Sequence, residues 1–326
     1  MYVVTGAAGL IGSAVVWELN NRGIEDILLV DHLGTSEKWK NLRALKYSDY
    51  LEKEVFRHLL SDGEDFCGEI EAIIHMGACS ATTETDASYL IENNYNYTVD
   101  LAEFAVAKGI PFIYASSSAT YGDGSLGYVD DESKIEDLRP LNMYGYSKQM
   151  FDLWAKKNNL FDKITGLKFT NVFGPNELHK AEMRSVVCRS YEQIRDDAKM
   201  KLFKSYLPEY KDGEQKRDFL YVKDAVSMLL HLLDNNICGL YNIGSGKAET
   251  WNSLTEAAFD AMGVETNIEY IDMPEHLKGK YQYYTKADMT KFYATGYDKP
   301  LYSLKDSVTD YIKNYMLQDR FLGDEK

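Results

Sequence analysis

The sequence predicts an α/β protein with a doubly wound parallel sheet and a smaller mixed α/β region toward the C-terminus. Short apolar runs alternate with longer segments of helical periodicity through the first half of the chain. This alternation is typical of βαβ units, in which helices cover both faces of a parallel sheet. Three glycines separate the first apolar run from the first helical segment, and an acidic residue ends the second run. Together these features indicate a Rossmann arrangement.

The elements follow one another in the order that this fold requires. We expect strands at residues 2–5, 27–30, 72–74, 112–115, 164–169 and 240–243. We expect helices after the glycine segment and near residues 52–62, 83–108, 142–159, 180–197, 222–234 and 251–262, with an irregular polar stretch at 208–216. Residues 1–172 then form a dinucleotide-binding domain, completed by 215–250, and residues 173–326 mainly bind substrate.

Composition and charge exclude several classes of function. The 326 residues carry a formal charge of −15, which disfavours nucleic acid and anionic membranes as partners. No apolar run is long enough to span a membrane, and no basic leader precedes the first strand, so we expect a cytoplasmic protein. The six histidines and four cysteines are dispersed; we expect reduced thiols and no metal site. The cysteines are Cys67, Cys79, Cys188 and Cys238.

The glycine segment GAAGLIG indicates a site for a dinucleotide. Gly6, Gly9 and Gly12 permit a tight turn, a close approach to a pyrophosphate and tight packing of helix on strand. Asp31 ends the second strand, where a carboxylate binds the adenosine ribose and favours NAD over NADP. Lys38 lies seven residues later, where its charge would neutralise the extra phosphate of NADP. The spacing leaves the choice between NADP and NAD open.

A tyrosine and a lysine in NMYGYSK form the predicted catalytic pair. Tyr144 and Lys148 are four residues apart, so a helix places them on one face. The ammonium is expected to lower the pKa of the phenol and make it a useful base. Upstream, SSSATYG follows a predicted strand. We expect the Ser117 hydroxyl to bond the reacting oxygen, with Ser118 as the alternative and a capping or turn serine as the structural explanation.

These motifs together resemble the extended short-chain dehydrogenase/reductase superfamily, within its sugar-nucleotide epimerases. The resemblance covers the whole chain and includes the following segments: DILLVDHL, HMGACSATTETD, NNYNYT, YGYSK, NVFGPNELHK, KRDFLYV, YNIGSGKAE and LKGKYQYYTKADM. It implies an epimerase that binds NADP, with NAD as the alternative, and inverts C6 of an ADP-linked heptose. It also implies a ring-like homo-oligomer of five subunits.

The resemblance assigns roles residue by residue. The implied cofactor contacts are Gly6, Gly9, Leu10, Ile11, Gly12, Asp31, His32, Lys38, Lys53, Met76, Gly77, Ala78, Cys79, Ser80, Asn93, Lys148, Val172 and Lys180. The implied substrate contacts are Asn171, Glu182, Arg189, Phe203, Lys204, Ser205, Tyr206, Arg217 and Tyr281. Tyr144 matches the catalytic tyrosine and Lys180 a second acid/base. His32, Glu182, Arg189 and the FKSY segment at 203–206 depart from the residues usual in the family.

Two acid/base residues suit the implied reaction, because a carbonyl that rotates before reduction presents its oxygen to different protein groups. Tyr144 and Lys180 would serve on opposite sides of the pocket, whereas a surface position is the structural explanation for Lys180. A UDP-hexose 4-epimerase is the nearest alternative enzyme. A nucleotide-binding sensor without catalysis is the alternative from another class.

Overall fold

The computed structural model describes residues 1–62, 69–275 and 281–324 of the chain. Cys67 and the start of the LKGKYQYYTKADM segment therefore lie outside the described residues. Within the described ranges, Cys79, Cys188 and Cys238 are free thiols. No helix in these ranges is long and apolar enough to cross a membrane.

A seven-stranded parallel sheet forms the larger part of the molecule, with the strand order β11-β6-β5-β4-β1-β2-β3. The strands are β1 (Tyr2–Thr5), β2 (Ile27–Asp31), β3 (Asp49–Glu52), β4 (Ala72–His75), β5 (Phe112–Ser117), β6 (Ile164–Phe169) and β11 (Gly239–Ile243). The predicted fold class is confirmed. The last of these strands shows that the chain returns to the large sheet after leaving it at β6.

Helices cover both faces of the sheet, so adjacent residues of one strand enter different apolar cores. Val4 packs in the core that contains α1 (Leu10–Asn21) and α7 (Val222–Asp234). Val3 packs in the core of the other face, with α2 (Lys53–Asp62), α4 (Tyr97–Lys108) and α5 (Met143–Lys157). Between α3 (Ala87–Leu90) and α4 the chain forms a π-helical segment, η2 (Ile91–Asn96).

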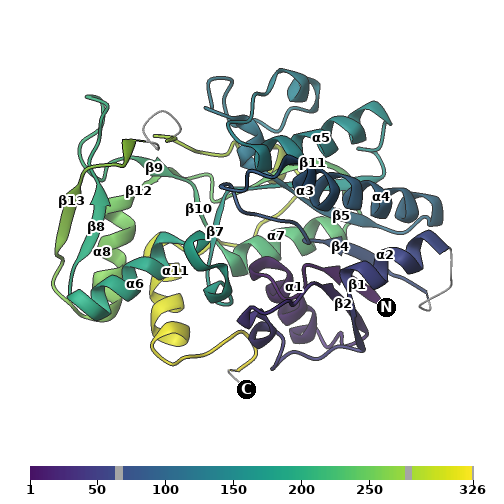
Figure 1. The fold of residues 1–326 in the computed structure, drawn as a ribbon, viewed down its shortest axis with the longest axis horizontal. Coiled ribbons are helices and arrows are strands. Elements are labelled where there is room, and N and C mark those ends of the chain that lie inside the picture. Colours follow the sequence, from purple (N-terminus) through teal and green to yellow (C-terminus); the bar gives the residue numbers. More distant parts are fainter. Residues whose placement is uncertain (63–68, 276–280, 325–326) are drawn as a thin grey trace.

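The second region lies off the carboxyl ends of the sheet strands, on the left in Figure 1. It is built on the parallel pair β8 (Met200–Phe203) and β13 (Ile268–Ile271), against which α6 (Val186–Asp197) and α8 (Trp251–Met262) pack. Short pairs connect it to the sheet: β7 (Asn171–Phe173) with β10 (Phe219–Tyr221), and β9 (Lys216–Arg217) with β12 (Glu249–Thr250). The C-terminal elements are α10 (Thr290–Tyr293), α11 (Leu304–Asp310) and the π-helical η6 (Tyr311–Met316).

Four short 3-10 segments complete the described elements and lie mostly at loops around the sheet. They are η1 (Glu37–Asn41), η3 (Ser118–Tyr121), η4 (Glu132–Asp137) and η5 (Leu178–Met183). The continuous helix predicted over 180–197 is wrong, because the chain breaks between η5 and α6. Ala181 has φ 46° and ψ −121°, which no helix contains, and Ser185 caps the new helix by accepting a hydrogen bond from the Cys188 amide.

The sheet reverses its strand order beside β1, since β2 and β3 lie on one side and β4, β5 and β6 on the other. At such a switch point, the loops after the two central strands diverge and leave a crevice at their carboxyl ends. Here the diverging loops are the glycine segment after β1 and the HMGACS segment after β4. The fold therefore places two of the predicted cofactor segments side by side.

Candidate active site

A cavity of about 870 Å³ lies at the carboxyl ends of the sheet strands and extends to the second region. Its wall includes every predicted cofactor and catalytic residue: Gly6, Gly9, Leu10, Ile11, Gly12, Asp31, His32, Lys38, Lys53, Met76, Gly77, Ala78, Cys79, Ser80, Asn93, Ser117, Tyr144, Lys148, Val172 and Lys180. Five of the predicted substrate residues also line it: Asn171, Glu182, Arg189, Arg217 and Tyr281.

The glycine segment leaves no room for side chains where it meets the neighbouring loop. Gly6 has φ +63°, and a Cβ there would stand 2.6 Å from the Gly77 amide nitrogen. A Cβ on Gly12 would stand 2.1 Å from the Gly6 carbonyl oxygen. This loop therefore forms a cradle of bare backbone at the start of α1, where free amides and the helix dipole favour a phosphate group. The cradle fits the pyrophosphate of a dinucleotide.

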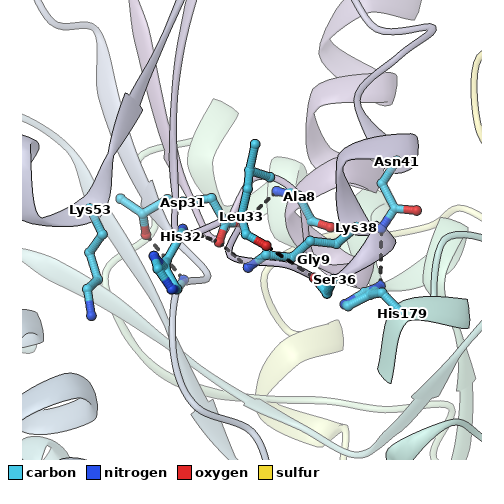
Figure 2. A network of polar contacts seen from close by, with 12 residues as sticks. Ala8, Gly9, Asp31, His32, Leu33, Ser36, Lys38, Asn41, Lys53 and His179 are labelled. Carbon is cyan, nitrogen blue, oxygen red and sulfur yellow. Dashed lines mark hydrogen bonds and ion pairs between the residues drawn. The ribbon is translucent and has the colours of Figure 1, made fainter. Parts of the chain in front are cut away.

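The carboxylate of Asp31, at the end of β2, is fully engaged by protein donors (Figure 2). Its Oδ2 accepts a hydrogen bond from the Ala8 amide at 2.7 Å. Its Oδ1 accepts one from the His32 amide at 2.7 Å and one from the Lys38 ammonium at 2.6 Å. The ion pair with Lys38 offsets the negative charge that would otherwise face the cavity here.

Two further basic side chains border this corner. The Lys53 ammonium donates to Asn93 Oδ1 at 2.7 Å and lies 3.1 Å from Glu54. His32, which replaces the residue usual in the family, is exposed and has its Nδ1 3.2 Å from a Glu52 carboxylate oxygen. The side chains that the resemblance assigned to the adenosine end are thus gathered at one end of the cavity.

The start of α5 brings the tyrosine and the serine run together. Asn142 caps this helix by accepting a hydrogen bond from the Gly145 amide at 2.8 Å. Gly145 packs so closely on the serine segment that a Cβ would stand 2.8 Å from the Ala119 carbonyl oxygen. The hydroxyl of Ser117, the predicted serine, lies close enough to Tyr144 to lower the pKa of its phenol. Ser118, the alternative, lines the cavity nearby but begins η3.

Burial controls the titration of the Tyr144–Lys148 pair. It raises the pKa of Tyr144 above the usual range, and the nearby Ser117 hydroxyl offsets only part of this rise. The expectation that Lys148 lowers the tyrosine pKa is therefore wrong for the protein itself, because desolvation of the phenolate outweighs other influences. Burial also lowers the pKa of Lys148 to about 8, while the charge of Asp152 opposes that shift.

A buried ion pair lies one turn beyond Lys148 on α5. Asp152 is fully buried and contacts Lys168 of β6, whose ammonium is 3.0 Å from Oδ2. The Tyr114 and Ser116 hydroxyls donate to the two carboxylate oxygens, each at 2.8 Å. This network joins α5 to β5 and β6 directly beneath the tyrosine and lysine. We find no sequence signal that would have singled out Asp152 beyond its helical spacing from Lys148.

Lys180 reaches the cavity from η5 rather than from a regular helix. The buried carboxylate of Glu177 stabilises this segment by accepting hydrogen bonds from the amide and the hydroxyl of Ser185, both at 2.6 Å. Burial raises the pKa of Glu177, and those hydrogen bonds and the charge of Lys180 oppose the rise. Lys180 is half-buried, so the simple surface position considered as its structural explanation is not what the fold shows.

The far end of the cavity combines aromatic rings with arginine. The Arg217 guanidinium lies 5.6 Å from the Trp251 ring centroid and 5.1 Å from that of Tyr281. The Trp251 indole donates to the Tyr281 hydroxyl at 2.8 Å, which joins the two rings. Such a group can hold an anionic ligand by charge and a flat ligand by stacking. Trp251 was missed by the sequence analysis, where it marked only the start of a helix.

The FKSY segment does not join the cavity wall formed by the described residues. Lys204 pairs with Asp272 at 3.1 Å on the outer side of the β8–β13 pair. The Tyr206 amide donates to the Tyr283 hydroxyl at 2.8 Å, and Tyr283 packs edge-to-face on Tyr281. Among the described residues, Tyr283 links the segment to Tyr281 of the cavity wall. The roles predicted for Phe203, Lys204, Ser205 and Tyr206 stay predictions.

His179 and Arg184 also line the cavity and were not predicted as site residues. Burial lowers the pKa of His179 to about 4, with the charges of Lys180 and Lys38 acting in the same direction. The dipeptide HK in NVFGPNELHK was the available signal for His179. Arg184 lies in the turn between η5 and α6, and only the structure shows that this turn borders the cavity.

Comparisons with known proteins agree with the fold and the cavity. The model of the NAD dependent epimerase/dehydratase family matches residues 2–244. An ADP-L-glycero-D-manno-heptose-6-epimerase of Nitratidesulfovibrio vulgaris is 54% identical over 97% of this chain and 98% of its own. A protein of the same name from Fusobacterium nucleatum is 48% identical over 98% and 99% of the two chains.

Solved structures match the fold over nearly its full length. The ADP-L-glycero-D-manno-heptose-6-epimerase of Helicobacter pylori superimposes with a TM-score of 0.80 at 24% identity, covering 96% of this chain and 95% of its own. A UDP-N-acetylglucosamine 4-epimerase from Methanobrevibacter ruminantium gives a TM-score of 0.80 at 21% identity over 97% and 98%. With its glycine cradle, its tyrosine–lysine pair on α5 and these full-length relatives, the chain belongs to the NAD dependent epimerase/dehydratase family.

Proposed function

We propose that this protein is an ADP-L-glycero-D-manno-heptose 6-epimerase, which inverts C6 of ADP-D-glycero-D-manno-heptose in the synthesis of a lipopolysaccharide core precursor. The relatives of that name at 54% and 48% identity support the substrate. The observation that carries the proposal is that two different proton-transfer groups, Tyr144 and Lys180, border one cavity with the glycine cradle. A dehydrogenase that works on one face of its substrate needs only one such group.

The chemistry explains the need for two groups. The inverted carbon is a carbinol carbon whose hydrogen is not acidic, so simple deprotonation cannot invert its configuration. When bound, a nicotinamide dinucleotide supplies the hydride acceptor and donor for oxidation at that carbon and reduction on its opposite face. The hydroxyl proton must be removed at one orientation of the side chain and restored at the other. Protein groups on two sides of the cavity meet this requirement.

The residues of the chain divide the work as follows. Tyr144, whose pKa the nearby Ser117 hydroxyl lowers, takes or returns the hydroxyl proton on the α5 side. Lys148 supplies positive charge beside it and holds the cofactor ribose. Lys180 acts on the side of η5, where the carbonyl oxygen lies after rotation. Tyr144 is half-buried in the cavity wall, and bound cofactor and substrate would exclude water from the reacting oxygen, which strengthens each polar contact there.

We further propose NADP as the preferred cofactor, with NAD as the alternative. Asp31 normally rejects a 2′-phosphate, but here its carboxylate is neutralised by Lys38 at 2.6 Å and accepts two backbone amides. Lys53 and His32 border the same corner and add donors for a phosphate. Lys38→Ala leaves Asp31 uncompensated, so we expect NADP affinity to fall at least tenfold relative to NAD affinity. Parallel titrations with both dinucleotides measure this ratio.

Basic side chains at the substrate end suit a nucleotide diphosphate. Lys180, Arg184, Arg189 and Arg217 all line that part of the cavity, although the chain as a whole carries a charge of −15. Guanidinium groups bind phosphates through paired hydrogen bonds. The rings of Trp251 and Tyr281, which a hydrogen bond joins, offer an aromatic surface for a base. The proposal also includes a homo-oligomer in the cytoplasm. The family resemblance implies five subunits, and light scattering measures their number.

The deciding experiment is incubation of the protein with ADP-D-glycero-D-manno-heptose, followed by chromatographic separation of the two C6 epimers. We expect both epimers at equilibrium from either starting compound. Lys180→Met should lower the rate strongly while NADP binding survives. Dinucleotide binding without interconversion would overturn the proposal and favour a sensor, whereas interconversion of UDP-hexoses at C4 would favour the other class of epimerase.

A further inference from the structure

Asn41, a residue with no role in the site described so far, connects two parts of the cavity wall (Figure 2). It ends η1 and is 2% exposed. Its side-chain nitrogen donates to the Ala8 carbonyl oxygen at 2.7 Å and to the Asn176 carbonyl oxygen at 2.9 Å. The same nitrogen lies 3.3 Å from Nδ1 of His179. One buried amide thus joins Ala8, 33 residues before it, to Asn176 and His179, which lie 135 and 138 residues after it in the chain.

The two carbonyls belong to segments with different tasks. Ala8 lies in the glycine cradle, and its amide also bonds the Asp31 carboxylate at 2.7 Å. Asn176 and His179 form the turn immediately before Lys180. A continuous series of hydrogen bonds therefore runs from the cofactor corner, through Ala8 and Asn41, to the turn that carries Lys180.

We propose that Asn41 is a positioning residue for Lys180, which it holds at a set distance from the dinucleotide cradle. This inference rests on the proposed function, in which Lys180 is the second acid/base. Lys180 needs such support because η5 is short and is broken at Ala181, so the backbone holds Lys180 only through local 3-10 bonding, in which its amide donates to the Glu177 carbonyl oxygen at 3.0 Å. Side-chain bonds from distant residues add to this local bonding.

The amide group suits this task better than other side chains of its size. Its nitrogen carries two hydrogens, which match the two carbonyl oxygens, and it adds no charge. If Asn41 were replaced by a residue without an amide, the Ala8 and Asn176 carbonyl oxygens would each lose a donor in an interior where unpaired acceptors are costly. His179 is also neutral at physiological pH, because burial lowers its pKa to about 4. The His179 imidazole therefore adds no positive charge beside the Lys180 ammonium.

A second asparagine supports the same turn from below. Asn176 adopts a left-handed conformation with φ 76°. Its side-chain nitrogen donates to the Ser13 hydroxyl of α1 at 3.0 Å, and its oxygen accepts the Leu322 amide at 3.0 Å. These bonds fix the base of the turn to the first helix and to the C-terminal segment. Asn41 differs in that it contacts the cradle itself.

The test compares Asn41→Ala with the matched control Asn20→Ala. Asn20 makes the same kind of contact on α1, since its nitrogen donates to the carbonyls of Ile24 at 3.0 Å and Lys46 at 2.9 Å, away from the cavity. We expect Asn41→Ala to lower kcat about 10- to 100-fold, as small displacements of reacting groups do, with KM for the ADP-heptose changed less than threefold. Asn20→Ala should keep kcat while lowering the melting temperature to a similar extent.

A double-variant cycle separates positioning from general structural damage. If Asn41 acts through Lys180, Asn41→Ala should lower kcat no further when Lys180→Met is already present. A further full loss in the double variant, or equal loss of kcat in Asn20→Ala, would overturn the inference. If Asn41→Ala does not fold, Asn41→Ser retains one donor and should show a smaller loss of kcat with the same dependence on Lys180. An unaltered kcat in Asn41→Ser would overturn the positioning role.

The outcomes also distinguish this inference from the function beneath it. Near-full turnover in Lys180→Met would remove the second acid/base and thus the proposed scheme. A strong effect of Lys180→Met together with normal kcat in Asn41→Ala would leave that scheme in place and overturn only the positioning role.

Discussion

The two proposed proton-transfer groups of the cavity are held in different ways. Tyr144 stands on a regular helix, α5, whose capping residue and internal hydrogen bonds set its direction. Lys180 stands on the short, broken segment η5 and depends on buried side chains from elsewhere in the chain. The first arrangement is local, because the hydrogen bonds of one helix are enough to set the direction of the side chain. The second arises only when distant segments meet.

This difference bears on how each region tolerates change. A helix distributes its stability over many backbone bonds, so one lost side-chain contact displaces it little. A loop pinned by a few buried polar groups depends strongly on each of them, because any unpaired group left behind is costly. We therefore expect changes beneath α5 to affect stability more than geometry, and changes around η5 to affect geometry and turnover.

The largest expected effect tests the helical side directly. Tyr144→Phe removes the proton acceptor but keeps the ring, so packing on α5 should be preserved. We expect kcat to fall about 10³-fold, within the range that general acid–base groups contribute. Stopped or single-turnover assays with the ADP-heptose measure this rate, and NADP binding provides the control. Turnover within tenfold of the unchanged protein would show that Tyr144 is not the acceptor.

The buried pair beneath α5 should govern stability. Asp152→Ala leaves the Lys168 ammonium without its carboxylate in an interior position, which costs about 3–5 kcal/mol of unfolding free energy. Asp152→Leu combined with Lys168→Met removes both charges and should recover part of that loss, because the buried Tyr114 and Ser116 hydroxyls still lose their acceptor. Urea unfolding of the single and double variants measures the difference. Equal instability of the two would mean that packing, rather than charge pairing, supports this helix.

The sequence predicted the helical side of the site better than the loop side, for a physical reason. Spacing within one helix fixes which side chains share a face, so Tyr144 and Lys148 could be paired from residue numbers alone. The glycine segment was equally readable, because only glycine fits its backbone. Strands such as β3 and β8 were missed, since they are short and β3 lies at the edge of the sheet with little of the apolar alternation that marks buried strands.

The loop side depends on contacts that no local pattern encodes. Lys180 entered the site through the family resemblance, while the helix expected around it proved to be broken at Ala181. Neither Asn41 nor Glu177 stood out, because a lone asparagine or glutamate in a polar stretch resembles any solvated residue. Their burial and partners appear only in the folded chain. The pKa of Tyr144 was likewise misjudged, because the degree of desolvation is a tertiary property.

A substitution at Glu177 tests the loop side by a route independent of Asn41. Glu177→Gln replaces one acceptor oxygen by an NH₂ group that cannot accept from Ser185, so we expect a loss of about 1–3 kcal/mol in stability. We also expect kcat to fall about tenfold as η5 moves. Glu132→Gln is the control, since Glu132 accepts the Leu240 amide at 3.0 Å far from the cavity. A similar fall in kcat in that control would remove the special role of η5.

The smallest effect concerns the pH dependence of cofactor binding. Burial lowers the pKa of Lys148 to about 8, so its charge is lost as the pH rises through that value. If the ammonium holds the cofactor ribose, NADP affinity should be constant below pH 8 and fall above it by up to about tenfold per pH unit. Tyr144 and His75 do not titrate in this range, since burial raises the pKa of the first and lowers that of the second. Lys148→Arg stays charged and should bind NADP with little pH dependence between 7 and 9, as titrations by fluorescence can show. A native affinity that is flat over the same range would mean that Lys148 does not contact the cofactor through its charge, and that α5 presents only Tyr144 to the reaction.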